Sequence, residues 1–139
     1  SSTQAIIFCN TIRKVTWLTE KLNEKNFSIT TIHGKMTQSE RNNVVNDFRN
    51  SKTRLLLTTD LLARGIDIPQ VNLVINYDLP LNKETYIHRI GRCGRFGKKG
   101  LSITMVKMED SNDVKLLNRM KNYYKLDINE IPENIHEYI

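Results

Sequence analysis

The sequence is poor in cysteine and has no long hydrophobic run, and both absences narrow the class of protein. Its 139 residues include two cysteines, Cys9 and Cys93, which are far apart and form no CxxC pair. A disulfide framework is therefore not expected, and a reducing compartment, cytoplasmic or nuclear, is the simpler assignment. No apolar stretch approaches the ~20 residues that a transmembrane helix needs, so we expect no membrane association.

The sequence also lacks the groups that hold a metal ion or cradle a triphosphate. His33, His88 and His136 are scattered, and none has a partner at metal-ligand spacing. GKMT (34–37) resembles the end of a P-loop, but Ile29 stands where the earlier glycine would be. There is no acidic cluster suited to Mg²⁺. These absences disfavour a stand-alone nucleotide-hydrolysing enzyme.

Composition and charge indicate one globular domain with an anionic partner. Hydrophobic residues make up 39% of the chain and charged residues 26%, which is typical of a folded domain rather than a disordered one. The formal net charge is +6. This excess of positive charge favours nucleic acid or nucleotide as the ligand.

Apolar periodicity alternates between strand and helix patterns along the chain. Strands are predicted at 4–8, 28–33, 54–59, 72–78 and 101–106. Helices are predicted at 11–25, from a capping box at Thr37 and Glu40, at 83–90 and at 109–124, with a turn or short helix between the third and fourth strands. Strands buried on both faces and joined by helices indicate an α/β fold, a parallel sheet flanked by helices on both faces.

The first helix is predicted to turn one apolar face to the sheet. Ile12, Val15, Leu18 and Leu22 recur at helical spacing on this face. Trp17, the single tryptophan, is expected to be a packing residue of the same helix.

Small and polar residues follow three of the predicted strands. These are Cys9-Asn10-Thr11, His33-Gly34-Lys35 and Thr58-Thr59-Asp60. Ligands of open parallel sheets bind beyond the carboxyl ends of the strands, so these clusters are expected at one edge. The alternative is that they are ordinary loop residues, because loops are polar.

The segment HRIGRCGRFGKKG (88–100) repeats glycine and a cation every three residues. The planar fork of arginine matches two phosphate oxygens, and glycines let a ligand approach the backbone. Arg92 and Arg95 therefore suit a phosphate chain. The alternative is that the arginines pair with Asp60, Asp67 or Asp78. For Arg89 the two interpretations are equally strong, whereas for Arg92 and Arg95 pairing is the weaker one.

Three other polar residues have two readings each. Asp67 could accept hydrogen bonds from a ribose hydroxyl, or could pair with Arg64. Gln38 and Arg41, near the start of the second helix, could hold a nucleic-acid backbone, or could belong to a solvated helix face.

Four segments together resemble the C-terminal RecA-like domain of DEAD-box RNA helicases over nearly the whole chain. IIFCNT (6–11) resembles motif IV, Gly34 with Gln38-x-x-Arg41 the region that follows it, TTDLLARGID (58–67) motif V, and HRIGRCGRFG (88–97) motif VI. The stretches LLARGID, VINYDLP and RKVTWLTEKL look most like the translation initiation factor 4A branch, although exon-junction and ribosome-biogenesis relatives read similarly.

This resemblance implies a role for each matching residue. Arg92 and Arg95 would be arginine fingers on the γ-phosphate of ATP, Phe96 would stack near adenine, and Gly65 and Asp67 would face the nucleotide. The RNA path would use Asn10, Thr11, Gly34, Gln38, Arg41, Thr59 and Asp60. Arg64, His88 and Arg89 would link the two ligands.

The resemblance also implies what this chain does not contain. Residues 1–139 would be one RecA-like domain, and a missing N-terminal domain would carry the Walker A and Asp-Glu-Ala-Asp motifs and hold Mg²⁺. The partners would be that domain, single-stranded RNA of any sequence, and translation initiation scaffold proteins. A non-catalytic RNA-binding adaptor remains the alternative. Lys35 and Cys93 depart from the usual residues of the family.

Overall fold

The computed structural model describes residues 3–66, 68–94, 100–125, 128–131 and 133. Strands and helices alternate throughout the described chain. The strands are β1 (Ala5–Cys9), β2 (Ile29–Thr31), β3 (Leu55–Thr59), β4 (Leu73–Asn76) and β5 (Leu101–Thr104). The helices are α1 (Ile12–Glu24), α2 (Gln38–Arg49), α3 (Asp60–Ala63), α4 (Lys83–Ile90) and α5 (Ser111–Tyr124). The predicted elements are confirmed, and the turn or short helix before the fourth strand is the four-residue helix α3.

The five strands form one parallel sheet in the order β2-β3-β1-β4-β5. Ile7 of the central strand pairs with Leu57 on one side and Ile75 on the other. From β1 the chain goes to the edge strand β2, returns to β3 beside β1, and then crosses β1 to β4 and β5 on the other side. This reversal puts the ends of β3, β1 and β4 side by side, at the position where open α/β sheets bind ligands.

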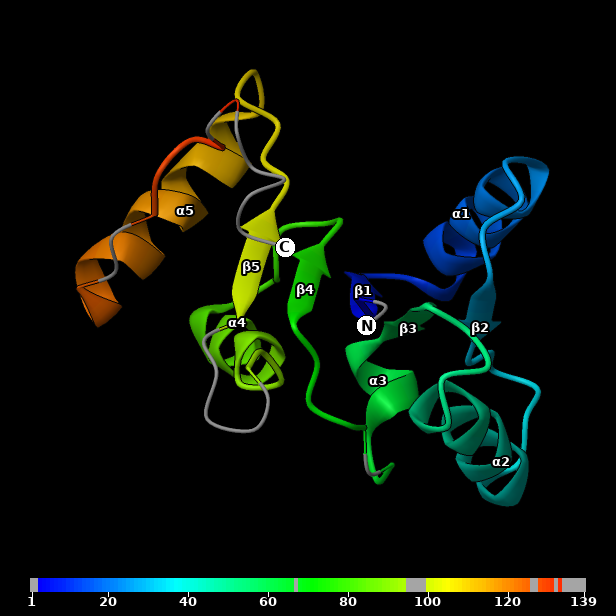
Figure 1. The fold of residues 1–139 in the computed structure, drawn as a ribbon. Helices are drawn as coiled ribbons and strands as arrows, with labels where there is room; N and C mark the ends of the chain where they lie inside the picture. Colours follow the sequence, from blue (N-terminus) through cyan, green and yellow to red (C-terminus); the bar gives the residue numbers. More distant parts are fainter. Residues whose placement is uncertain (1–2, 67, 95–99, 126–127, 132, 134–139) are drawn as a thin grey trace.

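Alternate residues of β1 supply the cores on the two faces of the sheet. Ile6 and Phe8 belong to one buried cluster with Phe48 of α2. Ile7 and Cys9 point the other way and pack with Val15 of α1 and its neighbours. Figure 1 shows α1 and α2 on opposite sides of the sheet. The predicted arrangement, a parallel sheet with helices on both faces, is therefore confirmed.

A third apolar cluster joins the last two helices. Tyr86 of α4 and Met120 of α5 are buried against each other's helix, together with Leu79 from the segment after β4. Full burial of such side chains stabilises a fold by about 1.5–3 kcal/mol each. This cluster fixes the position of α4, which carries Arg89 and ends two residues before Arg92.

The capping box predicted at the start of α2 is present. The Glu40 amide donates to Thr37 Oγ1 at 3.1 Å, and the Thr37 amide donates to Glu40 Oε2 at 2.9 Å. Two amides that have no partner within the helix are thereby satisfied.

Two residues of α1 are more exposed than their pattern predicts. Ile12 is 43% exposed and Trp17 is 47% exposed. Trp17 follows Val15 by two residues, about 200° around the helix, so it points away from the sheet that Val15 faces. Its predicted packing role is wrong, and its exposed ring needs another explanation. Among the described helices, none has the length and hydrophobicity of a membrane span.

Candidate functional site

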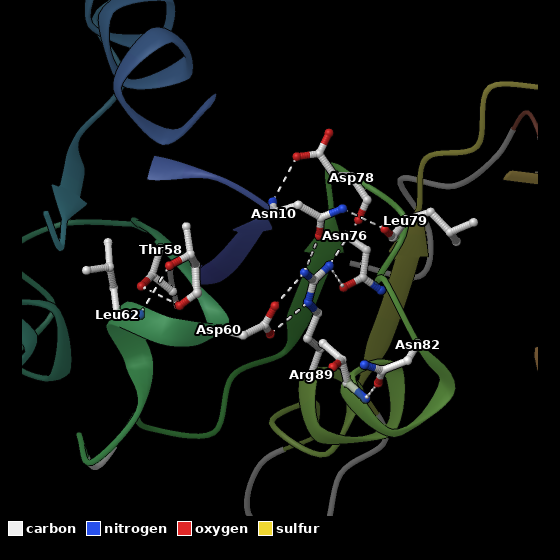
Figure 2. A network of polar contacts seen from close by, with 11 residues as sticks. Asn10, Thr58, Asp60, Leu62, Asn76, Asp78, Leu79, Asn82 and Arg89 are labelled. Carbon is white, nitrogen blue, oxygen red and sulfur yellow. Dashed lines mark hydrogen bonds and ion pairs between the residues drawn. The ribbon is translucent and has the colours of Figure 1, made fainter. Parts of the chain in front are cut away.

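Arg89 of α4 is the centre of a polar cluster at the carboxyl edge of the sheet (Figure 2). Its side chain is 1% exposed. Nε donates to Asp60 Oδ1 at 3.0 Å, and Nη2 donates to Asp60 Oδ2 at 2.7 Å. This two-pronged geometry is the strongest that an arginine and a carboxylate adopt. Of the two readings for Arg89, pairing with Asp60 is the one that occurs.

The rest of the guanidinium is bonded to the ends of β1 and β4. Nη2 also donates to Asn10 Oδ1 at 2.7 Å, and Nη1 donates to the carbonyl of Asp78 at 3.0 Å and to Asn76 Oδ1 at 3.4 Å. The Phe8 ring lies 5.3 Å from Cζ and covers the cation. A buried charge is tolerable only when it is paired and fully hydrogen-bonded, which is the case here. Arg89 thus ties three strand ends to α4.

Two asparagines complete this cluster. Asn10 donates through Nδ2 to the carbonyl of Leu79 at 2.9 Å. Asn76 is fully buried and donates through Nδ2 to Thr104 Oγ1 at 3.0 Å, which extends the cluster to β5. The motif comparison did not predict Asn76. A signal existed, because a single amide inside the buried run LVIN must find a polar partner.

A cavity of about 420 Å³ lies beside this cluster, between α3 and α4. It brings together six of the predicted site residues: Asp60, Arg64, Gly65, His88, Arg89 and Arg92. Phe8, Ile66 and Ile68 form apolar parts of its wall. Residues predicted for RNA, for ATP and for the link between them therefore share one cavity.

Arg92 differs from Arg89, one helical turn earlier, in having few bonds. Its side chain makes one described hydrogen bond, from Nη1 to the carbonyl of Ile68 at 3.3 Å, and no carboxylate of the described residues pairs with it. Its backbone is held firmly, because the Val71 amide donates to the Arg92 carbonyl at 2.8 Å. A fixed backbone with an unpaired guanidinium at a cavity wall suits an anionic ligand.

Gly65 connects this cavity to the start of α2. Its φ of 77° lies in the left-handed region, where glycine has no steric penalty. The Gly65 carbonyl accepts a hydrogen bond from Gln38 Nε2 at 2.9 Å. A residue predicted for the nucleotide and one predicted for RNA are therefore directly bonded.

The remaining predicted RNA residues lie around the start of α2 and at two helix caps. Arg41 makes one long bond, from Nη2 to the carbonyl of Gly34 at 3.5 Å, and its buried Nε has no described partner. The hydroxyl of Thr11 caps α1, and that of Thr59 caps α3 while being 3% exposed. A ligand could reach the exposed Thr11, whereas the side chain of Thr59 is closed off.

Three predicted residues lie outside the described part of the chain. They are Asp67, predicted to contact the ribose or to pair with Arg64, Arg95, predicted to be an arginine finger, and Phe96, predicted to stack near adenine. Their predictions stay predictions.

Both cysteines are free thiols, and their surroundings favour the protonated form. Burial, and then the Asp78 carboxylate, raises the pKa of Cys9 to about 12. Burial also raises the pKa of Cys93. A thiolate is the reactive form, so neither cysteine is prepared to act as a nucleophile near neutral pH. Among the described residues, no group of three or more His, Cys, Asp or Glu side chains could hold a metal ion.

Comparison with known proteins assigns this arrangement to a family. Residues 1–97 match the family model described as the helicase conserved C-terminal domain. Eukaryotic initiation factor 4A-3 of Nicotiana plumbaginifolia is 55% identical over 99% of this chain, which spans 34% of the length of that relative. The chain thus spans about a third of this relative.

Solved structures agree in fold. The C-terminal domain of the DEAD-box protein Dbp5 has a TM-score of 0.86 and 36% identity, covering 99% of this chain and 79% of that one. Dbp5 of S. cerevisiae bound to RNA and ADP BeF3 has a TM-score of 0.83 and 38% identity, covering 97% of this chain and 36% of that one. With its parallel sheet and the Arg92 cavity at the switch point, this chain belongs to the helicase conserved C-terminal domain family, in the form found in DEAD-box proteins.

Proposed function

We propose that this chain is the C-terminal half of an ATP-dependent RNA helicase and supplies cations to the phosphates of an ATP held by an N-terminal domain. One observation carries the proposal. Arg92 lines a cavity at the switch point with an almost unbonded guanidinium, while neighbouring Arg89 is fully bonded. Arg89, which is fully bonded, would hold the cavity wall in place, and the guanidinium of Arg92 would face the ligand.

The role of Arg92 is electrostatic. As a phosphoryl group transfers, charge spreads over its oxygens, and an arginine brought to them stabilises that charge. Arg95 would act with it, Phe96 would stack near adenine, and Gly65 and Asp67 would line the nucleotide side. The chain has cations for a triphosphate, and its described residues form no cluster of three or more metal-binding side chains; in this proposal the N-terminal domain would bind Mg²⁺.

The RNA side would lie along the carboxyl ends of β1 and β3 and the start of α2. Gly34, Gln38 and Arg41 surround the capped start of α2, where backbone amides and the helix dipole favour phosphate. The side chains of Asn10 and Asp60 are bonded to Arg89, so these residues would position the RNA path and make few direct hydrogen bonds to RNA. Thr11 would contact RNA through its exposed side, and Thr59 through its backbone.

Arg64, His88 and Arg89 would couple the two sides. All three line the Arg92 cavity, and Arg89 is bonded to Asp60 and Asn10 of the predicted RNA path. The Gln38–Gly65 hydrogen bond is a second direct link. A shift of the RNA-binding residues would therefore move the residues that face the nucleotide. RNA-stimulated hydrolysis requires such a connection.

The pathway is proposed to be translation initiation, with scaffold proteins of that pathway as partners. The support is the 55% identity to initiation factor 4A-3, and the exon-junction and ribosome-biogenesis branches are the alternatives. Solved relatives are bound to protein partners, Gle1 for one Dbp5 domain and RraA for SrmB of E. coli. These complexes support the part of the proposal that gives this domain a role in docking protein partners.

The test joins this chain to a matching N-terminal domain of the initiation factor relative and measures ATP hydrolysis with single-stranded RNA. We expect RNA-stimulated hydrolysis that Arg92→Ala lowers by about 10³-fold or more. Arg54→Ala removes an exposed arginine from a site remote from the cavity and should change nothing. Near-normal hydrolysis by Arg92→Ala overturns the proposal. RNA binding with no hydrolysis in any pairing would instead support the non-catalytic adaptor.

A further inference from the structure

Two connected hollows lie between α1 and the beginning of α5. The first has a volume of about 300 Å³ and is lined by Thr11, Arg13, Lys14, Trp17 and Tyr77. The second has a volume of about 420 Å³ and extends past Asp78 to Met105, Lys107, Asp110 and Asp113. Lys14 and Tyr77 line both, so the hollows form one surface depression, which we call the α1–α5 groove.

Each end of the groove has an exposed apolar side chain. Trp17 is 47% exposed at the α1 end, and Met105 is 49% exposed at the α5 end. Neither belongs to a buried core cluster of the described chain. Exposed tryptophan beside a depression is the usual anchor of a protein interface, and methionine adapts to varied partners.

The two ends of the groove carry opposite charge. Arg13 and Lys14 stand beside Trp17, whereas the end that contains Met105 is lined by Asp110 and Asp113 against one cation, Lys107, and so has an excess of negative charge. Within the described chain, the only ion pair of these four residues joins Lys14 to Asp78 at 3.9 Å. Asp110 caps α5 through Oδ1, and Asp113 accepts the Lys107 amide through Oδ2, so each carboxylate has one oxygen with no described bond to offer an occupant.

This charge pattern decides between two classes of occupant. A nucleic acid has one sign of charge along its length, so its phosphates would be repelled by the aspartates at the α5 end. A peptide can present an acidic residue to Arg13 and a basic one to Asp113. Charge complementarity therefore favours a polypeptide.

The groove also lies away from the Arg92 cavity. Tyr77 packs with the cluster under α1, on the sheet face opposite Phe8, which lines the Arg92 cavity. Figure 1 shows α1 and α3 on opposite sides of the sheet. An occupant of the groove would leave that cavity open to a nucleotide.

We propose that the α1–α5 groove binds an extended peptide segment of a partner protein. One apolar side chain of the segment packs on Trp17 with an acidic residue beside it at Arg13 and Lys14. A second apolar side chain packs on Met105 with a basic residue beside it at Asp110 and Asp113. The groove adjoins the proposed RNA path, because Asn10 and Thr11 also line it, but the inference does not rest on the proposed ATPase function.

Trp17 itself is the reporter for the test, because it is the only tryptophan in the chain. Synthetic tryptophan-free peptides of the form Glu-Phe-spacer-Leu-Lys, with spacers of different length, are titrated against the chain while its emission is followed. We expect a saturable emission change for at least one spacer. Peptides with alanine in place of Phe and Leu, or with glutamine in place of the charges, should bind at least several-fold more weakly.

Variants then locate the site with a fluorescein-labelled peptide. Trp17→Ala should weaken binding by about ten- to thirty-fold, the size of a hot-spot loss. Phe27→Ala removes an aromatic side chain that is 51% exposed outside the groove, and should leave binding unchanged. The Arg13→Glu, Lys14→Glu double variant should reject the Glu-to-Lys peptide and accept one with lysine at both ends.

Two results overturn the proposal. The first is the absence of an emission change with every spacer while circular dichroism shows a folded chain. The second is a Trp17→Ala variant that weakens binding of a labelled oligouridylate and leaves peptide binding intact, which would assign the groove to RNA. Loss of ATP hydrolysis in any variant does not bear on it, so the two proposals fail separately.

Discussion

At the scale of single residues, two arginines three positions apart differ sharply in their bonding. Arg89 is 1% exposed and bonded to Asp60, Asn10, Asn76 and the carbonyl of Asp78. Arg92 lies at a cavity wall with one long hydrogen bond. Their sequence context is nearly identical, so the difference arises from which strand ends each side chain reaches. The first is bonded within the fold, and the second is the one that we propose for the ligand.

We therefore predict that Arg89→Ala lowers the free energy of unfolding by about 2–4 kcal/mol. The substitution leaves the carboxylate of Asp60, whose side chain is 39% exposed, as a partly buried and unpaired charge. It also removes the hydrogen-bond donor of Asn10, Asn76 and the Asp78 carbonyl. Urea denaturation followed by circular dichroism measures this change.

Arg92→Ala is the matched comparison for that experiment. It should change the free energy of unfolding by less than about 1 kcal/mol, because only one long bond to a carbonyl is lost. Equal destabilisation by the two variants would show that the contrast between the arginines is wrong.

The buried thiol of Cys9 predicts a pH dependence of stability. Its pKa is raised to about 12 in the fold, against about 8.5 for a free cysteine. Between these values the unfolded chain loses the proton and the folded chain keeps it, so this contribution to stability is complete below about pH 8.5 and declines as pH rises towards 12. Chemical denaturation from pH 7 to 10, compared with Cys9→Ala, isolates the effect. A difference between the two proteins that does not vary with pH would contradict it.

At the scale of elements, the caps fix where helices begin and so where site residues stand. Thr37 and Glu40 close the start of α2, which places Gln38 next to the Gly65 carbonyl. Thr59 caps α3, which places Asp60 against Arg89. Cap residues thus decide the register of side chains at the carboxyl edge of the sheet.

Thr37→Ala should lower the free energy of unfolding by about 1 kcal/mol, the usual value for a lost N-cap. It should also weaken binding of single-stranded RNA in the joined protein, because the start of α2 becomes less ordered. Thr37→Ser keeps the capping oxygen and should preserve both properties. Thermal unfolding and fluorescence anisotropy provide the measurements, and a Ser variant as damaged as the Ala variant would point to another cause.

At the scale of the whole molecule, the order of strands positions one cavity and one groove. The reversal of direction around β1 gathers the ends of β3, β1 and β4 around Arg89, beside the Arg92 cavity. Packing of α1 against the opposite face leaves Trp17 beside the depression that leads to α5. In the two proposals, a nucleotide would bind on one side of the domain and a protein segment on the other.

The isolated chain is predicted to hydrolyse no ATP and to bind single-stranded RNA weakly. It has the cations but not the phosphate cradle, and RNA attraction would come from a few cations such as Arg41 and Arg64. The logarithm of the binding constant should fall with the logarithm of salt concentration with a slope of about −1 to −2. Filter binding at several salt concentrations tests this, and tight ATP binding by the isolated chain would contradict it.

The sequence by itself determined the elements and the family, because both depend on local signals. Apolar periodicity and the Thr37–Glu40 box are set by neighbours a few residues apart, and the motif segments are contiguous. The wrong prediction for Trp17 came from its residue type, because the same helical periodicity places it about 200° from Val15 and away from the sheet.

Only the tertiary structure decided which polar side chains are hydrogen-bonded within the fold and which are left for a ligand. Arg89 takes Asp60 and Asn10 as partners across 29 and 79 residues of chain. Asn76 becomes part of the same cluster through the packing of α4 beneath the sheet. Such contacts depend on the docking of distant segments, and the energy of a buried charge depends on its surroundings, so neither could be read from residue type or spacing.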